Sequence, residues 1–285
     1  MIRQYGLHAG LFFLTLVSTL FAGAYYIQDY DLLREFPRYV LPGLVKGAPF
    51  SLPLMLILAS HELAHYRNSM RHHVDASLPY FIPFPLNLFG TLGAVIKMKS
   101  PIRDRDALID IGASGPLVGF AFSVVVCVVG LSLSDATAVR PIGHEEAALG
   151  GSILYLLMAK AIIGADLSHQ AVNLHPIAVA GWVGLFVTSI NLMPVGQLDG
   201  GHISYAFLGR YHRTVSRVFI FVLAVMGYWF TGWLMWAALL IFIGTRHPPV
   251  IDPERPLDLK RKLAGAGSLV VFIITFTPMP VYINL

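Results

Sequence analysis

The sequence predicts an all-α polytopic membrane protein, with about six or seven transmembrane helices and one small β-hairpin. Of its 285 residues, 56% are hydrophobic and 13% are charged, whereas soluble domains carry about 25% charged residues. Its mean hydropathy is +0.67, and long apolar runs recur from one end to the other. The chain has too few charged side chains to cover a water-exposed surface of its size. We therefore expect a single integral-membrane domain over residues 1–285.

The apolar runs define the expected transmembrane helices, because a crossing needs about 20 apolar residues. They lie at 6–26, 50–69, 107–131, 149–163, 176–193, 214–230, 231–245 and 263–281. The runs 149–163 and 231–245 are short for a crossing. The run 6–26 resembles a signal peptide, because Arg3 precedes it and the small residues Ala22-Gly23-Ala24 end it. Its length favours an uncleaved anchor instead.

Basic residues in the loops predict the orientation of the chain in the membrane. Lys and Arg are concentrated in the segments 67–105, 210–217 and 246–262. The segments 132–147 and 164–175 contain only Arg140 between them. The basic segments are therefore expected on the cytoplasmic side and the other two outside, which requires that run 149–163 does not cross. This distribution explains the net charge of +4, so we expect no nucleic-acid partner.

A metal-binding pattern lies inside the run 50–69. The sequence His61-Glu62-Leu63-Ala64-His65 fits HExxH. On a helix, imidazoles four residues apart face the same side and can share a zinc ion, and the intervening carboxylate can act as a general base. An ionisable group within a membrane is itself a functional-site hypothesis. The alternative interpretation is a helix with two histidines that bond to their neighbours.

Asp199 is the best candidate for a third metal ligand, because a catalytic zinc site has three protein ligands and one open position. In the predicted topology, the apolar segments 50–69 and 176–193 cross the membrane in the same direction. Asp199 is therefore expected at the same depth in the membrane as His61 and His65. In the alternative interpretation, Asp199 before two glycines caps a short helix at 201–210. We do not expect His202 to be a fourth ligand, because it would close the site.

These residues resemble the site-2 protease family of intramembrane zinc metalloproteases. The family motif Asn-x-x-Pro-x-x-x-x-Asp-Gly is matched by Asn191, Pro194, Asp199 and Gly200. A Gly-Pro-Leu-x-Gly stretch of the family appears at 115–119. The resemblance covers about residues 50–210. It implies one zinc ion held by His61, His65 and Asp199, with Glu62 as the base, and it implies that Asn191 orients or stabilises the reacting carbonyl group.

A short hairpin is expected after the HExxH helix. Residues 79–89 are rich in proline and aromatic side chains, and residues 90–99 contain strand-forming Val and Ile. This segment is similar to the re-entrant β-hairpin that the family places beside its active site. We expect substrate to pair with an exposed strand by β-augmentation. The strand would consist of Gly90, Thr91, Leu92, Gly93, Ala94 and Val95. A purely structural lid is the alternative.

The predicted function is hydrolysis of peptide bonds within or near the transmembrane segments of membrane proteins. The catalytic core would span 50–210, with a transmembrane helix and loop at 1–49 and further transmembrane helices at 211–285. We expect the active site to lie toward the cytoplasmic side of a cell or organelle membrane. Two alternatives are a catalytically inactive relative that binds membrane proteins and a zinc transporter. The intact Glu62 argues against the first, and the scarcity of polar residues in the other runs argues against the second.

Other polar residues near the site are given structural roles. We expect His72 and His73 to lie in a solvated interfacial loop. Asp110 is expected to pair with Arg103 or Arg105, or to cap a helix. The single cysteine, Cys127, excludes an internal disulfide. No PDZ-like or nucleotide-binding domain is expected, and the sequence leaves the oligomeric state open.

Overall fold

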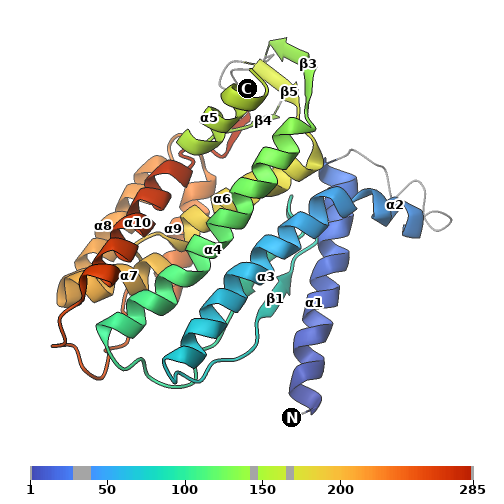
Figure 1. Cartoon of the computed structure of the whole chain (residues 1–285). Coiled ribbons are helices and arrows are strands. Elements are labelled where there is room, and N and C mark those ends of the chain that lie inside the picture. The colour runs from blue at the N-terminus through green and yellow to red at the C-terminus, as the bar shows by residue number, and fades with distance from the viewer. Residues whose placement is uncertain (1, 28–39, 142–146, 165–169, 284–285) are drawn as a thin grey trace.

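Most of the described residues lie in α-helices, as the composition predicts. The computed structural model (Figure 1) describes all residues except 1, 28–39, 142–146, 165–169 and 284–285. The α-helices are α1 (Ile2–Ala22), α2 (Val40–Lys46), α3 (Ala48–Arg71), α4 (Arg105–Ser132), α5 (Ile153–Ile162), α6 (Pro176–Asn191), α7 (Asp199–Leu208), α8 (His212–Met226), α9 (Gly232–Ile243) and α10 (Leu259–Thr275). The short helical turns are η1 (Gly23–Ile27) and η2 (Gly209–Tyr211). The strands are β1 (Tyr80–Pro83), β2 (Thr91–Val95), β3 (Asp135–Pro141), β4 (Ala147–Leu149), β5 (Gln170–Asn173) and β6 (Val281–Ile283).

Helices α3, α4 and α6 pack against one another at the centre of the molecule (Figure 1). α7 and α10 contact α4, and α8 pairs with α9. The close approach of α4 and α6 depends on a small residue: a Cβ at Gly181 would lie 2.6 Å from the Sγ atom of Cys127. Small residues allow the backbones of helices to approach closely in membranes, where packing rather than burial from water drives helix association.

The small antiparallel sheet that was predicted after the HExxH helix is present. β1 pairs with β2 in a register that joins Tyr80 to Val95 and Phe81 to Ala94. Helix α1 lies along this hairpin (Figure 1). The Ser18 hydroxyl donates to the Gly90 carbonyl over 2.5 Å, and Phe12 packs edge-on against Phe81. The N-terminal helix therefore supports the hairpin.

Two further strand pairs, β3 with β5 and β4 with β6, lie at the opposite end of the molecule from the α3–α4 connection (Figure 1). The sequence did not predict them. β4 and β6 are separated by most of the C-terminal half of the chain, and they pair through Ala147 to Leu149 and Val281 to Ile283. Pairing between such distant, three-residue segments leaves no local periodic signal.

Two of the described helical segments are long and apolar enough to cross a membrane, Tyr5–Tyr25 and Arg105–Ser132. Shorter apolar helices are Ile153–Ile162, Pro176–Asn191 and Gly232–Ile243. The predicted count of six or seven crossings is therefore not established by helix length and composition. Run 149–163 forms only a ten-residue helix, α5.

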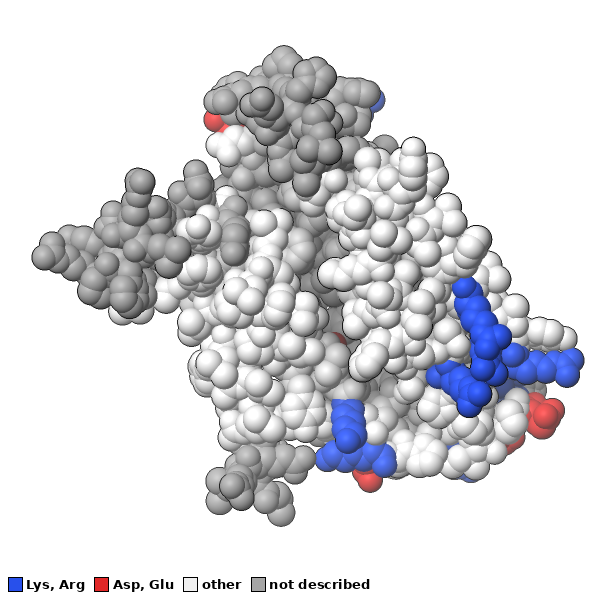
Figure 2. Space-filling view, turned by 180° about the vertical axis from the view of Figure 1, so that it is seen from behind, with Lys and Arg blue, Asp and Glu red and all other residues white. Residues whose placement is uncertain are grey.

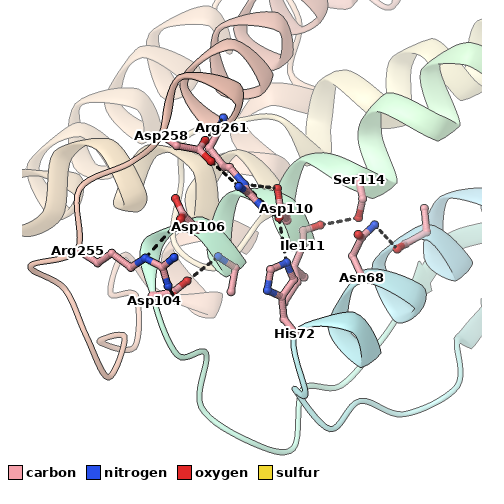
Figure 3. Close-up of polar contacts among 12 residues, drawn as sticks. Asn68, His72, Asp104, Asp106, Asp110, Ile111, Ser114, Arg255, Asp258 and Arg261 are labelled. Atoms are coloured by element: carbon pink, nitrogen blue, oxygen red, sulfur yellow. Dashed lines mark hydrogen bonds and ion pairs between the residues drawn. The ribbon is translucent and has the colours of Figure 1, made fainter.

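The polar contacts at one end of the bundle differ from the prediction (Figure 3). Asp110 does not pair with Arg103 or Arg105. Its carboxylate accepts hydrogen bonds from Arg261 at the start of α10, with an Nη2–Oδ2 distance of 2.6 Å, and lies 2.9 Å from Nε2 of His72. His72 therefore has a partner, contrary to the expectation of a solvated loop. The cause is the packing of α10 on α4, which places residues 151 positions apart side by side.

Candidate metal centre

Helix α3 presents three polar side chains at one level. His61, Glu62 and His65 are all buried. Because residues four positions apart lie on the same helix face, the two imidazoles meet, and their Nε2 atoms are 3.0 Å apart. Both Nε2 atoms therefore point to one place beside α3.

Asp199 reaches the same place from a different part of the chain. It is the first residue of α7, just after the irregular segment that follows α6. Its two carboxylate oxygens each lie 3.2 Å from one imidazole, Oδ2 from Nε2 of His61 and Oδ1 from Nε2 of His65. The N-cap position of α7 is Leu198, with no side-chain cap. The side chain of Asp199 is thus directed at the histidines and not at the start of its own helix.

The donor set fits zinc. The candidate ligand atoms of His61, His65 and Asp199 all lie within 4.8 Å of one another. Two imidazole nitrogens and one carboxylate oxygen, with a fourth position left open, form a typical catalytic zinc site. Nδ1 of His65 lies 2.7 Å from the carbonyl oxygen of Ile111, so its N–H donates there and Nε2 is free to bind a metal. His202, by contrast, is not one of the three; its Nδ1 lies 2.6 Å from Nε2 of His247.

Glu62 lies beside the three candidate ligands and not among them. Its Oε1 atom is 3.9 Å from Nε2 of His61, and the backbone of Ile96 lies close enough to interact with its carboxylate. A buried carboxylate at this distance can reach a water molecule that occupies the open position. Ile96, the residue that follows β2, therefore lies beside Glu62.

Asn191, the last residue of α6, also reaches the centre. Its Nδ2 atom lies 3.4 Å from Nε2 of His61. The amide is therefore close enough to interact with a group bound at the open position. Both Asn191 and Asp199 flank the irregular segment, so the break between α6 and α7 delivers two side chains to the site.

The predicted substrate strand divides into two parts. Residues Thr91 to Val95 form β2, whose partner among the described strands is β1 alone. One edge of β2 is thus unpaired by any described strand, and Leu92 and Val95 are exposed. Gly90 lies outside the strand in the turn, where its carbonyl accepts from the backbone N–H of Phe84 over 3.0 Å. Gly90 therefore closes the hairpin and is not part of the free edge.

Helix α4 supplies supporting groups whose roles the residue pattern alone did not reveal. A Cβ atom at Gly115 would overlap the imidazole of His65, and one at Gly119 would lie 3.0 Å from Nδ1 of His61. These glycines are the first and last residues of the Gly-Pro-Leu-x-Gly stretch. Their spacing of four matches the spacing of the two histidines, which is the signal that predicts a glycine face packed against the face of α3 that carries His61 and His65.

Comparison with known proteins identifies the family. Residues 49–231 match the family model described as peptidase family M50. The chain belongs to peptidase family M50. This match confirms the resemblance to the site-2 proteases that the three motifs indicated.

Several curated relatives of this M50 chain are named as zinc metalloproteases. It is 30% identical over 280 residues to probable zinc metalloprotease EGY2, chloroplastic, of Arabidopsis thaliana, covering 95% of this chain and 48% of the relative. It is 32% identical over 260 residues to probable zinc metalloprotease EGY1, chloroplastic, of the same plant, covering 88% and 45%. The EGY1 protein of Oryza sativa subsp. japonica is 31% identical over 251 residues, covering 85% and 42%. The M50 chain thus spans about half the length of these relatives. No solved structure matches it significantly.

Proposed function

We propose that this chain is an intramembrane zinc metalloendopeptidase that hydrolyses peptide bonds within or near the transmembrane segments of membrane proteins. The observation that carries the proposal is the convergence of His61, His65 and Asp199 from two helices, with Glu62 beside them. Membership of peptidase family M50 and the names of the relatives support both the metal and the reaction.

Each residue has a role that follows from its position. Zinc bound by His61, His65 and Asp199 would polarise the scissile carbonyl. It would also lower the pKa of a water molecule, so that the water can lose a proton and attack the carbonyl carbon near neutral pH. Glu62 accepts the proton of the attacking water and delivers it to the leaving amine. The amide N–H of Asn191 donates a hydrogen bond to the carbonyl oxygen as it gains negative charge.

The free edge of β2 is the proposed site of substrate binding. A transmembrane helix must unwind before a peptide bond can reach a catalytic group, and its exposed backbone then needs hydrogen-bond partners. The edge formed by Thr91, Leu92, Gly93, Ala94 and Val95 supplies such partners by β-augmentation. Because the next residue, Ile96, contacts Glu62, a peptide paired along β2 is guided to the acid.

The surface supports a membrane location with more crossings than the two long apolar segments. Large apolar side chains are exposed on helices outside those segments; Phe242 on α9 is 90% exposed and Phe221 on α8 is 68% exposed. Charged side chains gather toward one end of the face seen in Figure 2, beside a wide uncharged surface. This distribution is expected of about six or seven crossings, with the basic end and the active site toward the cytoplasmic side.

Glu62→Gln tests the proposal. The purified variant should retain zinc at the wild-type stoichiometry and lose cleavage of single-pass transmembrane segments that are co-reconstituted with it, because the amide cannot accept the proton. Glu254→Gln is the matched control, because Glu254 is exposed in the loop before α10. Equal cleavage by wild type and Glu62→Gln would exclude the assigned base.

The zinc and cleavage measurements address the first alternative, an inactive relative, and the distribution of candidate ligands bears on the second, a zinc transporter. An inactive wild type that binds zinc would favour a module that binds membrane proteins without cleaving them. A zinc transporter is not favoured, because a transport path needs successive ligand sets along the helices. Among the described residues, His, Cys, Asp and Glu side chains form a group able to hold a metal ion at one place, His61, His65 and Asp199.

A further inference from the structure

A second polar site lies at the ends of helices α8 and α9. A cavity of about 570 Å³ is lined there by three arginines, Arg213, Arg217 and Arg246. All three side chains are exposed. Arg217 and Arg246 are close enough to Arg213 to repel it electrostatically. The cavity therefore holds three positive charges that disfavour one another.

These charges are not neutralised by the described part of the protein. Within the described ranges, none of the three arginines has an acidic partner or a side-chain hydrogen bond. Two other arginines of the basic end differ from these three. Arg255, in the loop before α10, pairs with Asp104, and Arg261, in the first turn of α10, pairs with Asp110 (Figure 3). An orientation signal explains why basic residues lie at this end, but it does not explain why three of them converge on one cavity without an acid. The convergence indicates an anionic ligand.

The other wall of the cavity is apolar. Arg213, Arg217 and Ile220 share one face of α8, at spacings of four and three residues. Ile241 and Ile243 line the cavity from the C-terminal end of α9. A free inorganic anion would leave this isoleucine wall in contact with water. A ligand with one anionic group and an adjoining hydrocarbon chain can pair with the arginines and also cover the isoleucines.

We propose that this cavity binds an anionic phospholipid, with its phosphate among Arg213, Arg217 and Arg246 and an acyl chain along the three isoleucines. Basic pockets between membrane helices are a recurring means of binding anionic headgroups, and arginine is well suited to phosphate because its guanidinium presents several donors in a planar fork. The cavity lies at the basic end of a chain with large exposed apolar side chains, where headgroups would be available.

The lipid would contact the segment that carries a candidate metal ligand. Gln197 lines the arginine cavity and also a larger cavity of about 910 Å³ that includes Ile96 and His202. The same segment is held to α8, because the backbone N–H of Gly196 donates to the Ser216 hydroxyl over 3.2 Å. Asp199 follows Gln197 by two residues. Lipid bound on α8 therefore stabilises the position of Asp199, a step that rests on the proposed function.

Native mass spectrometry of the full chain tests the site directly. The protein is released from nanodiscs that contain equal amounts of phosphatidylglycerol and phosphatidylcholine, and the retained lipid is counted. Wild type should retain phosphatidylglycerol preferentially. A triple variant, Arg213→Gln/Arg217→Gln/Arg246→Gln, should bind it about 100-fold more weakly, because each basic residue near an anionic lipid contributes about 1 kcal/mol. The control removes three exposed arginines elsewhere, Arg67→Gln/Arg71→Gln/Arg103→Gln, and should retain the lipid as wild type does.

Further arms separate the remaining outcomes. Equal retention by wild type and the triple variant overturns the site, and equal loss in the control variant shows general surface charge instead. Complete displacement of the lipid by millimolar inorganic phosphate overturns a lipid ligand in favour of a free anion. If the triple variant does not fold, Arg213→Gln and Arg246→Gln alone should each weaken retention about fivefold.

Cleavage in discs with and without phosphatidylglycerol tests the link to Asp199. Cleavage by wild type should be faster in discs that contain phosphatidylglycerol, and cleavage by the triple variant should be the same in both kinds of disc. An equal change in wild type and the triple variant would overturn the link. Absence of cleavage in every disc contradicts the proposed function, while lipid retention still decides the lipid site.

Discussion

Nδ1 of His65 lies 2.7 Å from the backbone carbonyl oxygen of Ile111. This contact joins α3 to α4 and fixes which imidazole nitrogen carries the proton. The N–H on Nδ1 donates to the carbonyl, so Nε2 faces His61 and Asp199 with its lone pair available. The backbone of α4 thus orients His65 so that its Nε2 atom faces the candidate metal site, as outer hydrogen-bond partners orient metal-binding histidines.

Gly115→Ala should weaken zinc binding by at least about 10-fold. The added Cβ overlaps the imidazole of His65 and must displace it from Asp199. Zinc affinity is measured by competition with a chelator. The matched control is Gly267→Ala in α10, where an added Cβ meets no atom within 4 Å. If both variants bind zinc like wild type, the fit of His65 against α4 is not important for the site.

Ala94→Pro should reduce cleavage by roughly 2- to 10-fold and leave zinc content unchanged, because proline removes a backbone N–H from β2 and a hydrogen bond contributes about 0.5–1.5 kcal/mol. Ala94→Val at the same position keeps the N–H and should cleave normally. Two quantities are measured for each variant: the rate of cleavage of a reconstituted transmembrane segment and the number of zinc ions bound per chain. Normal cleavage by the proline variant would argue against strand pairing with substrate. Equal losses in both variants would indicate a packing role for this position.

Removal of the Asp110–Arg261 pair should lower the stability of the helix bundle. The two side chains are each 22% exposed and form several hydrogen bonds, and a hydrogen bond to a charged group contributes about 1.5–3 kcal/mol. We expect Arg261→Met to lower the free energy of unfolding by an amount in this range, and Lys260→Met, at an exposed neighbour, to change it little. A double-mutant cycle with Asp110→Asn isolates the pairwise contribution. A coupling energy of zero would show that the contact has no influence on stability.

Acid should destabilise the loop after α9 through His247. Burial lowers the pKa of His247 to about 4, and its Nδ1 lies 2.6 Å from the Pro248 carbonyl, so the neutral ring accepts at Nε2 from His202. Tyr205 stacks on the ring and His212 lies at 6.0 Å between ring centroids. The unfolded state, with a pKa near 6.5, binds more protons between pH 6.5 and 4. This contribution to stability is therefore present above pH 6.5 and is lost as the pH falls toward 4.

The pH effect is measured as the melting temperature at pH 7 and pH 5 for wild type and His247→Gln. The decrease on acidification should be smaller in the variant, because the glutamine does not titrate. His73→Gln serves as the control, since His73 is exposed after α3. An identical decrease in wild type and His247→Gln would remove His247 as the source.

Features set by near neighbours in the chain were predictable from the sequence. The spacing of His61 and His65 predicted that they share a helix face, and the strand-forming residues Val95 and Ile96 predicted the hairpin. The partners of Asp110 were predicted wrongly, because the nearby Arg103 and Arg105 were plausible from the sequence while the true partner, Arg261, is brought close only by tertiary packing. Backbone groups such as the Ile111 carbonyl carry no side-chain signal. Likewise, the arginine cavity joins two helices whose relative position the residue pattern does not encode.

X-ray absorption spectroscopy at the zinc edge of the purified protein tests the metal centre most directly. We predict one zinc per chain with two imidazole nitrogens and at least two oxygens, at about 2.0–2.2 Å. Asp199→Ala should lose an oxygen ligand and most of its zinc. Contradictory results would be a wild-type protein that binds no zinc, or a spectrum that is unchanged when Asp199 is replaced.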